Sequence, residues 1–266
     1  MLIGKKGTAT TDISSASVEG VTIRKHDLAG DLIGKLTFTD AFFLMATGRT
    51  PNTGQSAILD ACLIAIAEHG LTPSVQAARM TYAADPAALQ GAVAAGVLGC
   101  GTVILGAADL CRKLLQEILE KASDGGDLSS AALAVAAAYR EAKRPIPGYG
   151  HPLHKPVDPR AERLIALAHE KGLAGRSVAA ATALTPAVAK VWGKPLPMNV
   201  SMAIATVAMD ADIPASLIRG IPILARTAGL LAHLAEEADN PIGFYLASKA
   251  EEAIRHTQSD KDAGQP

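Results

Sequence analysis

The stretch GYGHPLHKPVDPRA, residues 148–161, is the most irregular part of this chain and the most informative about its fold. With the four residues before it, it contains five prolines and two glycines, so no continuous helix can cross it. The same stretch carries His151, His154 and Arg160, side chains that bind anions. Ordered polar loops of this kind are where function concentrates, so we take it as the first candidate site.

Helical periodicity dominates on both sides of this loop from Phe38 onward, and no alternating pattern long enough for a sheet appears, apart from one short strand within 13–24. The apolar residues are mostly Ala, Leu, Ile and Val, which suits closely packed helices. We therefore expect an all-α fold. Helices are predicted from 38 to a stop at 48, and over 56–69, 74–83, 87–98, 107–122, 128–143, 161–171, 178–192, 202–211 and 213–238.

Composition limits the classes of partner. Of the 266 residues, 49% are hydrophobic and 3% aromatic, and the formal net charge is −1. No global basic field exists to recruit nucleic acid or an anionic membrane, so any anion site must be local. Residues 1–12 have no apolar segment of the secretory kind and are expected to be a tail.

Two further features concern the cellular location. Residues 91–108 contain no charge over a length close to that of a membrane span, but five glycines interrupt them, so we expect a buried helix and no membrane partner. Three cysteines without metal-ligand spacing, Cys62, Cys100 and Cys111, fit buried thiols in a reducing cytoplasm, where we place the protein.

His69 and Arg226 are the other candidate site residues. We expect His69 at a helix C-terminus, where the negative end of the dipole favours the charged imidazolium; a merely capping histidine is an equal alternative. Arg226 lies in an otherwise uncharged helical stretch, and a buried guanidinium needs a partner. That partner is either a bound anion or one of Glu236 and Glu237.

Three segments in the same order resemble the citrate synthase and citryl-CoA lyase superfamily: AEHGLTPSVQAAR (67–79), GYGHPLHKPVDPRA (148–161) and IPILARTAGLLAHLAEE (221–237). The resemblance extends over residues 15–255. With HDLAGDLIGKLTFTDAFFLMATGRTP (26–51) at the front, the chain looks most like stand-alone citryl-CoA lyases and the citrate-cleaving end of ATP-citrate lyase.

The resemblance implies a large helical lobe from residues 1–110 and 201–266, a small lobe from 111–200, and a homodimer. It implies that His69, His151, Arg160 and Arg226 bind the carboxylates and reacting oxygen of a polycarboxylate, as bidentate guanidinium groups do well. Coenzyme A, as a thioester, is expected near Gly148, Gly150, Leu153 and Lys194. No metal is expected at His151, His154 and Asp158, because the prolines between them restrict convergence.

The chain departs from the family pattern at three positions. Leu105 stands where the family has a histidine that polarises the thioester, and Pro152 follows His151 where an arginine is usual. Ser201 replaces the aspartate of Asn-Val-Asp that acts as the base, and serine is a poor base without an activator. Water, Ser201 or Asp158 would have to take over that task.

Two functions therefore compete. The first is a carbon–carbon lyase or synthase that acts on citryl-CoA or a related hydroxy acid thioester, with His151 and Ser201 as catalytic residues. The second is a non-catalytic homologue that binds a polycarboxylate or CoA thioester. Both require Arg160 and Arg226 to lie near His151 and to be free of internal ion pairs.

Overall fold

The computed structural model describes residues 9–123 and 127–255, and this part of the chain is mostly helical, as expected. Its elements in chain order are β1 (Ser14–Ser17), β2 (Gly20–Ile23), β3 (His26–Asp27), the π-helix η1 (Leu28–Leu32), α1 (Phe38–Thr47), α2 (Thr53–Ala67), α3 (Pro73–Ala84), α4 (Leu89–Leu105), α5 (Ala107–Ser123), α6 (Leu128–Glu141), α7 (Pro159–Glu170), α8 (Arg176–Trp192), α9 (Val200–Asp210), α10 (Ala215–Ile218), α11 (Gly220–Asp239) and α12 (Gly243–Ala253). The expected tail lies mostly outside the described residues.

The N-terminal segment corrects one prediction. Instead of a single strand within 13–24, three short antiparallel strands form a sheet in the order β1-β2-β3. The second turn is made by Arg24 and Lys25, both with positive φ, a conformation that non-glycine residues seldom adopt. The range 13–24 contains two strands instead of one because the chain turns at Val18 and Glu19, between β1 and β2.

Most helix ends follow from local chemistry. Asn52 and Gln55 form a reciprocal capping box at the start of α2, and Asp158 caps α7 ahead of Pro159. Other predictions differ from the structure. The stretch 213–238 divides into α10 and α11 at Arg219, the helix expected over 87–98 continues to Leu105 in α4, and α12 was not predicted.

The buried side chains form three clusters, two of which share α9. One cluster joins α1, α2, α7, α9 and α11, a second joins α5, α6, α8 and α9, and a third lies between α3, α4 and α11. Because α9 contributes Ile204 to the first cluster and Met202 to the second, it is buried on nearly every side. Its N-terminus is therefore a fixed point against which loops can be positioned.

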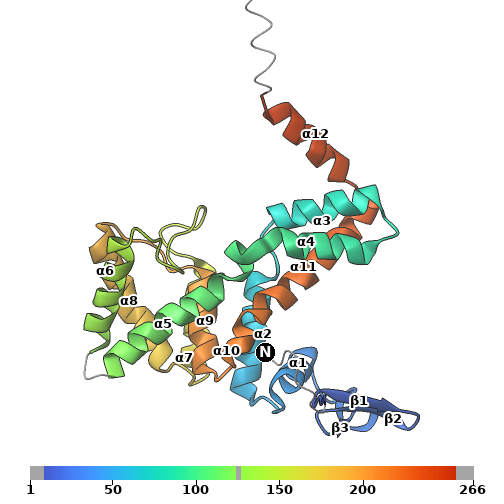
Figure 1. The fold of residues 1–266 in the computed structure, drawn as a ribbon, viewed down its shortest axis with the longest axis horizontal. Helices are drawn as coiled ribbons and strands as arrows, with labels where there is room; N and C mark the ends of the chain where they lie inside the picture. Colours follow the sequence, from blue (N-terminus) through green and yellow to red (C-terminus); the bar gives the residue numbers. More distant parts are fainter. Residues whose placement is uncertain (1–8, 124–126, 256–266) are drawn as a thin grey trace, which may run out of the picture.

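Figure 1 shows how these clusters are arranged. Helices α5, α6 and α8 lie on one side of the molecule, α3, α4 and α11 lie on the other, and α12 projects beyond α3. The division into lobes at residues 110/111 and 200/201 stays a prediction.

Two helical stretches are long and apolar enough to cross a membrane by length and composition, 89–123 and 215–239. The first contains the expected uncharged run, but Gly101 there has non-helical dihedral angles that separate two helical segments. Only 35% of the most apolar window of this stretch is buried, so the expectation of a buried helix was wrong, and the absence of a membrane partner stays a prediction.

Candidate functional site

The glycine-framed loop is attached to the N-terminal end of α9. Tyr149 and Met198 form an isolated antiparallel bridge, the Gly150 N–H donates to Pro197 O at 2.8 Å, and the Asn199 N–H donates to Gly148 O at 2.9 Å. His151 follows directly, so its position is set by the buried helix α9.

Asp158 joins the starts of α7 and α9. Its carboxylate is 1% exposed and accepts hydrogen bonds from the Arg160 N–H, Nε and NH2 at 3.1, 3.0 and 2.8 Å, and from the Val200 N–H at 3.1 Å. Burial alone would raise the pKa of Asp158, but these bonds and the charge of Arg160 bring that pKa below its usual value. Asp158 is therefore a structural carboxylate, and the structure does not support it as the replacement base.

Arg160 makes an internal ion pair with Asp158, so it does not meet the requirement stated above for both functions, and only its NH1 stays available to a ligand. Two of its nitrogens bind Asp158, whereas NH1 lies 3.5 Å from His69 Nδ1. The ion pair fixes the guanidinium beside the histidines, so one of its three nitrogens is left to face the site.

Three histidines, His69, His151 and His154, come together from distant parts of the chain. The ring centroid of His69 lies 5.5 Å from that of His151 and 5.6 Å from that of His154, and the rings of His151 and His154 stack at 4.3 Å. Sequence analysis did not place His154 in the substrate site. The signal was its position three residues after His151, a spacing that a tight turn brings together.

Local hydrogen bonds determine which nitrogen of His151 carries the proton. Nδ1 accepts from the backbone N–H groups of Leu153 at 3.1 Å and His154 at 2.9 Å. A neutral ring that accepts at Nδ1 has its proton on Nε2, so that atom is a donor. Burial, together with the charges of His154 and Arg160, lowers the pKa of His151 and favours this neutral form.

His69 departs from its expected environment. α2 ends at Ala67, so His69 lies beyond the helix, and its N–H, like that of Gly70, donates to the Glu68 carboxylate. Burial lowers the pKa of His69, and the charges of Arg160, His154 and Arg226 lower it further. The predicted stabilisation of a charged imidazolium by the helix dipole was therefore wrong.

Glu68 connects His69 to a buried polar network that sequence analysis missed. Its Oε2 lies 2.9 Å from His233 Nε2, and His233 Nδ1 lies 3.3 Å from Arg79 NH1. Arg79 in turn pairs with Glu236 at 2.8 Å and with buried Glu237 at 2.5 Å. Both glutamates that were alternative partners for Arg226 thus serve Arg79 instead.

Arg226 has no such partner. It is 5% exposed, and its buried NH1 has no hydrogen bond within the described residues. Its positive charge is one of the causes that lower the pKa of His69. An unpaired buried guanidinium nitrogen is costly, and an anionic ligand would remove that cost.

Leu105 and Ser201, which stand where the resemblance implies catalytic groups, offer little for catalysis. Leu105 is buried at the end of α4 and has no polar group to donate. Ser201 lies in the first turn of α9, and no hydrogen bond links its hydroxyl to a described side chain. The structure therefore shows no activator for Ser201 among the residues it describes.

The residues expected near coenzyme A have mixed surroundings. Gly148 is packed so tightly that an added Cβ would lie 2.6 Å from Met202 Cβ, and the N–H groups of Gly150 and Leu153 are already bonded internally. The Leu153 side chain is exposed, as is Lys194. The carbonyl oxygens of Gly148 and Gly150 also accept hydrogen bonds from Asn199, so the backbone contacts predicted with coenzyme A would have to share these groups.

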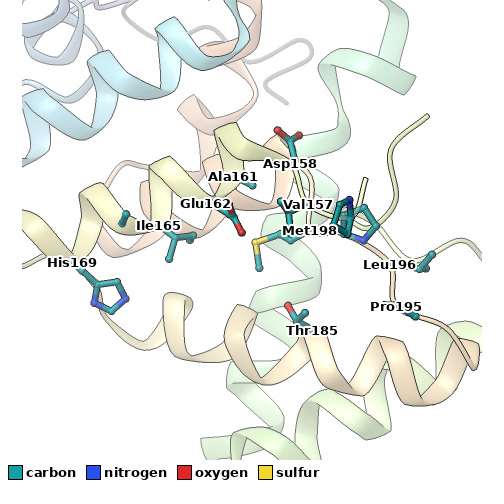
Figure 2. Close-up of a pocket in the computed structure, with 13 residues that line it drawn as sticks. Val157, Asp158, Ala161, Glu162, Ile165, His169, Thr185, Pro195, Leu196 and Met198 are labelled. Carbon is teal, nitrogen blue, oxygen red and sulfur yellow. The ribbon is translucent and has the colours of Figure 1, made fainter. Parts of the chain in front are cut away.

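A mostly apolar cavity of about 550 Å³ lies next to Lys194, between α7, α8 and the segment 195–198. Figure 2 shows Val157, Ile165 and Met198 lining it, with Asp158 at one end. The lining residues Pro156, Val157 and Asp158 lie between His154 and Arg160 in the chain.

The match to a family model decides the relationship: residues 7–243 match the model for citrate synthase, C-terminal domain. The chain belongs to the citrate synthase family. A citrate synthase from Synechocystis sp. is 32% identical over 209 residues, which cover 76% of this chain and 50% of that protein. This citrate synthase homologue thus spans about half the length of the curated relatives it matches.

Solved structures agree on the fold. The structure of citryl-CoA lyase from Hydrogenobacter thermophilus is similar with a TM-score of 0.81 and 31% identity, covering 97% of this homologue and 95% of that chain. ATP citrate lyase from Methanothrix soehngenii, in complex with citrate and coenzyme A, has a TM-score of 0.72 and 20% identity, with coverage of 89% and 40%. At that identity the likeness concerns the fold alone.

Proposed function

We propose that this citrate synthase homologue cleaves or forms the carbon–carbon bond of citryl-CoA or a closely related 2-hydroxy polycarboxylyl thioester. The observation that carries the proposal is Arg226, a buried guanidinium without a partner among the described residues, whose charge acts on His69. A polycarboxylate supplies the negative charge that this group needs.

The other site residues support the same ligand. NH1 of Arg160 and the Nε2–H of His151 provide further donors at the histidine cluster, on groups whose other nitrogens the protein already holds in place. A donor held at the reacting oxygen stabilises the charge that develops there as the bond breaks, which contributes roughly 3 kcal/mol. Fixed donors of this type are more effective than mobile ones, because no reorganisation is needed during the reaction.

We further propose that the thioester is a coenzyme A ester. The apolar cavity between α7 and α8 offers a surface for the pantetheine arm, and Lys194 beside it offers a positive charge for the phosphates. The likeness to a citryl-CoA lyase structure over nearly the whole of both chains supports the lyase direction.

A non-catalytic binding protein is the second candidate function, and Leu105 and Ser201 favour it. Neither residue supplies the group that the family uses at its position, and Ser201 has no activating partner among the described side chains. In this alternative the arginines and histidines retain a polycarboxylate without turnover.

One experiment separates the two functions. The protein is incubated with citryl-CoA, and released oxaloacetate is coupled to NADH oxidation by malate dehydrogenase, while thermal unfolding is followed with and without citrate. Turnover with a citrate-dependent rise in Tm supports the lyase. A rise in Tm without turnover supports the binding protein. If citryl-CoA is not cleaved and citrate does not raise Tm, both functions are refuted.

We also infer a cytoplasmic homodimer. The three cysteines are free and buried, and burial raises the pKa of Cys62 and Cys111 to about 12, as suits inert thiols in a reducing compartment. Large exposed apolar side chains on α2 and α4, Ile64 and Leu98, support a subunit interface there.

A further inference from the structure

The three histidines of the site differ in which ring nitrogens the protein already uses. Nδ1 of His151 accepts two backbone N–H groups, and Nδ1 of His69 faces a guanidinium nitrogen of Arg160, which can only donate. Each of these rings, when neutral, therefore has its proton on Nε2 and serves as a donor toward a ligand. Neither has a free acceptor nitrogen.

His154 is different. Its backbone N–H bonds to His151, but its ring nitrogens make no hydrogen bond to a described residue. The half-buried ring is nevertheless held in place, because it stacks on His151 and meets His69 edge-on. His154 thus combines a fixed position with a nitrogen free to accept a proton, next to two donors.

The reaction needs such an acceptor, and other groups at the site do not provide one. Asp158 is saturated by hydrogen bonds from Arg160 and Val200. The Ser201 hydroxyl has no activating base among the described side chains, and Leu105 has no polar group. By contrast, a neutral imidazole at His154 has one ring nitrogen whose lone pair no described residue occupies.

We propose that His154 is the acid–base residue of this site and replaces the carboxylate that the chain lacks at Ser201. This inference rests on the proposed lyase function. It assigns His69 and His151 to holding the substrate and gives the proton transfer to the third imidazole.

The step balances without a co-reactant. In the direction of cleavage, the free nitrogen of His154 takes the proton of the tertiary hydroxyl group, and the oxygen forms the carbonyl of the 2-oxo acid. The bond between the hydroxyl-bearing carbon and the methylene carbon next to the thioester breaks, and its electron pair forms the enolate of the thioester. The enolate carbon then takes the proton back from His154, which gives the methyl group and returns a neutral imidazole.

The three histidines could instead bind a metal ion, since one nitrogen from each ring lies within 4.8 Å of the others. The hydrogen bonds of His151 oppose this use, because a neutral ring with Nδ1 as acceptor presents a proton, not a lone pair, at Nε2. The positive charges of Arg160 and Arg226 nearby oppose it as well.

The test compares wild type with H154N, H154A and, as a matched control, H26N on the distant strand β3. We expect H154N to slow citryl-CoA cleavage about 10²- to 10⁴-fold with the citrate-dependent rise in Tm retained, and free imidazole to restore part of the rate of H154A. H26N should match wild type.

The contrary outcomes are distinct. If wild type and H154N cleave citryl-CoA equally fast, the role of His154 is refuted but the lyase function is not. The same holds if H154A is slow and imidazole does not restore its rate. Cleavage that stops with EDTA and returns with Zn²⁺ overturns that role in favour of a metal. A wild-type protein that leaves citryl-CoA intact overturns the proposed function and this step with it.

Discussion

Two buried arginines in this chain are partnered in opposite ways, and this contrast is the sharpest feature at the scale of single residues. Arg79 is enclosed with Glu237 and also binds Glu236. Arg226 has a buried nitrogen without a partner in the described part of the chain. The first arrangement is what a folded core requires, whereas the second costs stability that a ligand can return.

Replacing each arginine with methionine should therefore have opposite effects. R226M removes an unsatisfied buried donor, so we expect the free energy of unfolding without ligand to stay the same or rise by about 1–3 kcal/mol, while the citrate-dependent rise in Tm disappears. R79M leaves Glu237 buried without its partner and should lower that free energy by about 3–5 kcal/mol. Urea unfolding of both variants measures this, and a strongly destabilised R226M would contradict an unpaired Arg226.

The histidines predict how stability depends on pH. The pKa of His69 is lowered in the folded protein, so just below the ordinary value of about 6.5 the unfolded chain binds more protons than the folded one. The stabilising effect of the neutral ring is complete above that value and is lost as the pH falls from it toward the lower folded pKa. We expect H69Q to lose less stability than wild type across this range in urea titrations, and parallel curves would count against the shift.

At the scale of elements, the pairing of segments 148–150 and 197–199 positions the site. Both Gly148 and Gly150 have positive φ, +80° and +91°, but only Gly148 lacks space for a side chain. Its backbone lies against Met202 and Cys111, so the loop and α9 touch there without a gap. Packing therefore requires glycine at position 148. The contact of Gly148 with coenzyme A stays a prediction.

The two glycines provide a matched pair of variants. G150A should cost about 1–2 kcal/mol of stability through backbone strain alone. G148A should cost about 1–3 kcal/mol more, because the new Cβ would lie 2.6 Å from Met202 Cβ, and it should also weaken citrate binding by moving His151. Equal losses in chemical denaturation would show that the close packing at Gly148 is unimportant.

At the scale of the whole molecule, exposed apolar side chains predict association. Leu98 on α4 is 80% exposed, and Val18 in the turn between β1 and β2 is fully exposed. We expect sedimentation analysis to give a dimer for wild type and V18R, and a monomer for L98R, because a charge within an apolar interface is not compensated. A wild-type protein that sediments as a monomer would refute the dimer.

The helical fold could be predicted from the chain itself, and so could the candidate residues of the site. Capping at Asn52 and Asp158, the stop at Gly48 and the apolar periodicity are local signals, and the corresponding helix boundaries agree within a few residues. The site was predicted from His151 and Arg160 because they lie in one loop whose prolines exclude a helix. Element boundaries set by distant contacts, such as the break at Arg219, had no such local signal.

The sequence alone determined the fold class, the family resemblance and which side chains carry charge or an imidazole ring, because these depend on residue type and spacing. Only the tertiary structure decided which of those groups are satisfied. Arg79 takes the glutamates that were candidates for Arg226, and His154 joins His69 from a distant part of the chain. Partnership between polar groups depends on distances across the core, which no local pattern encodes.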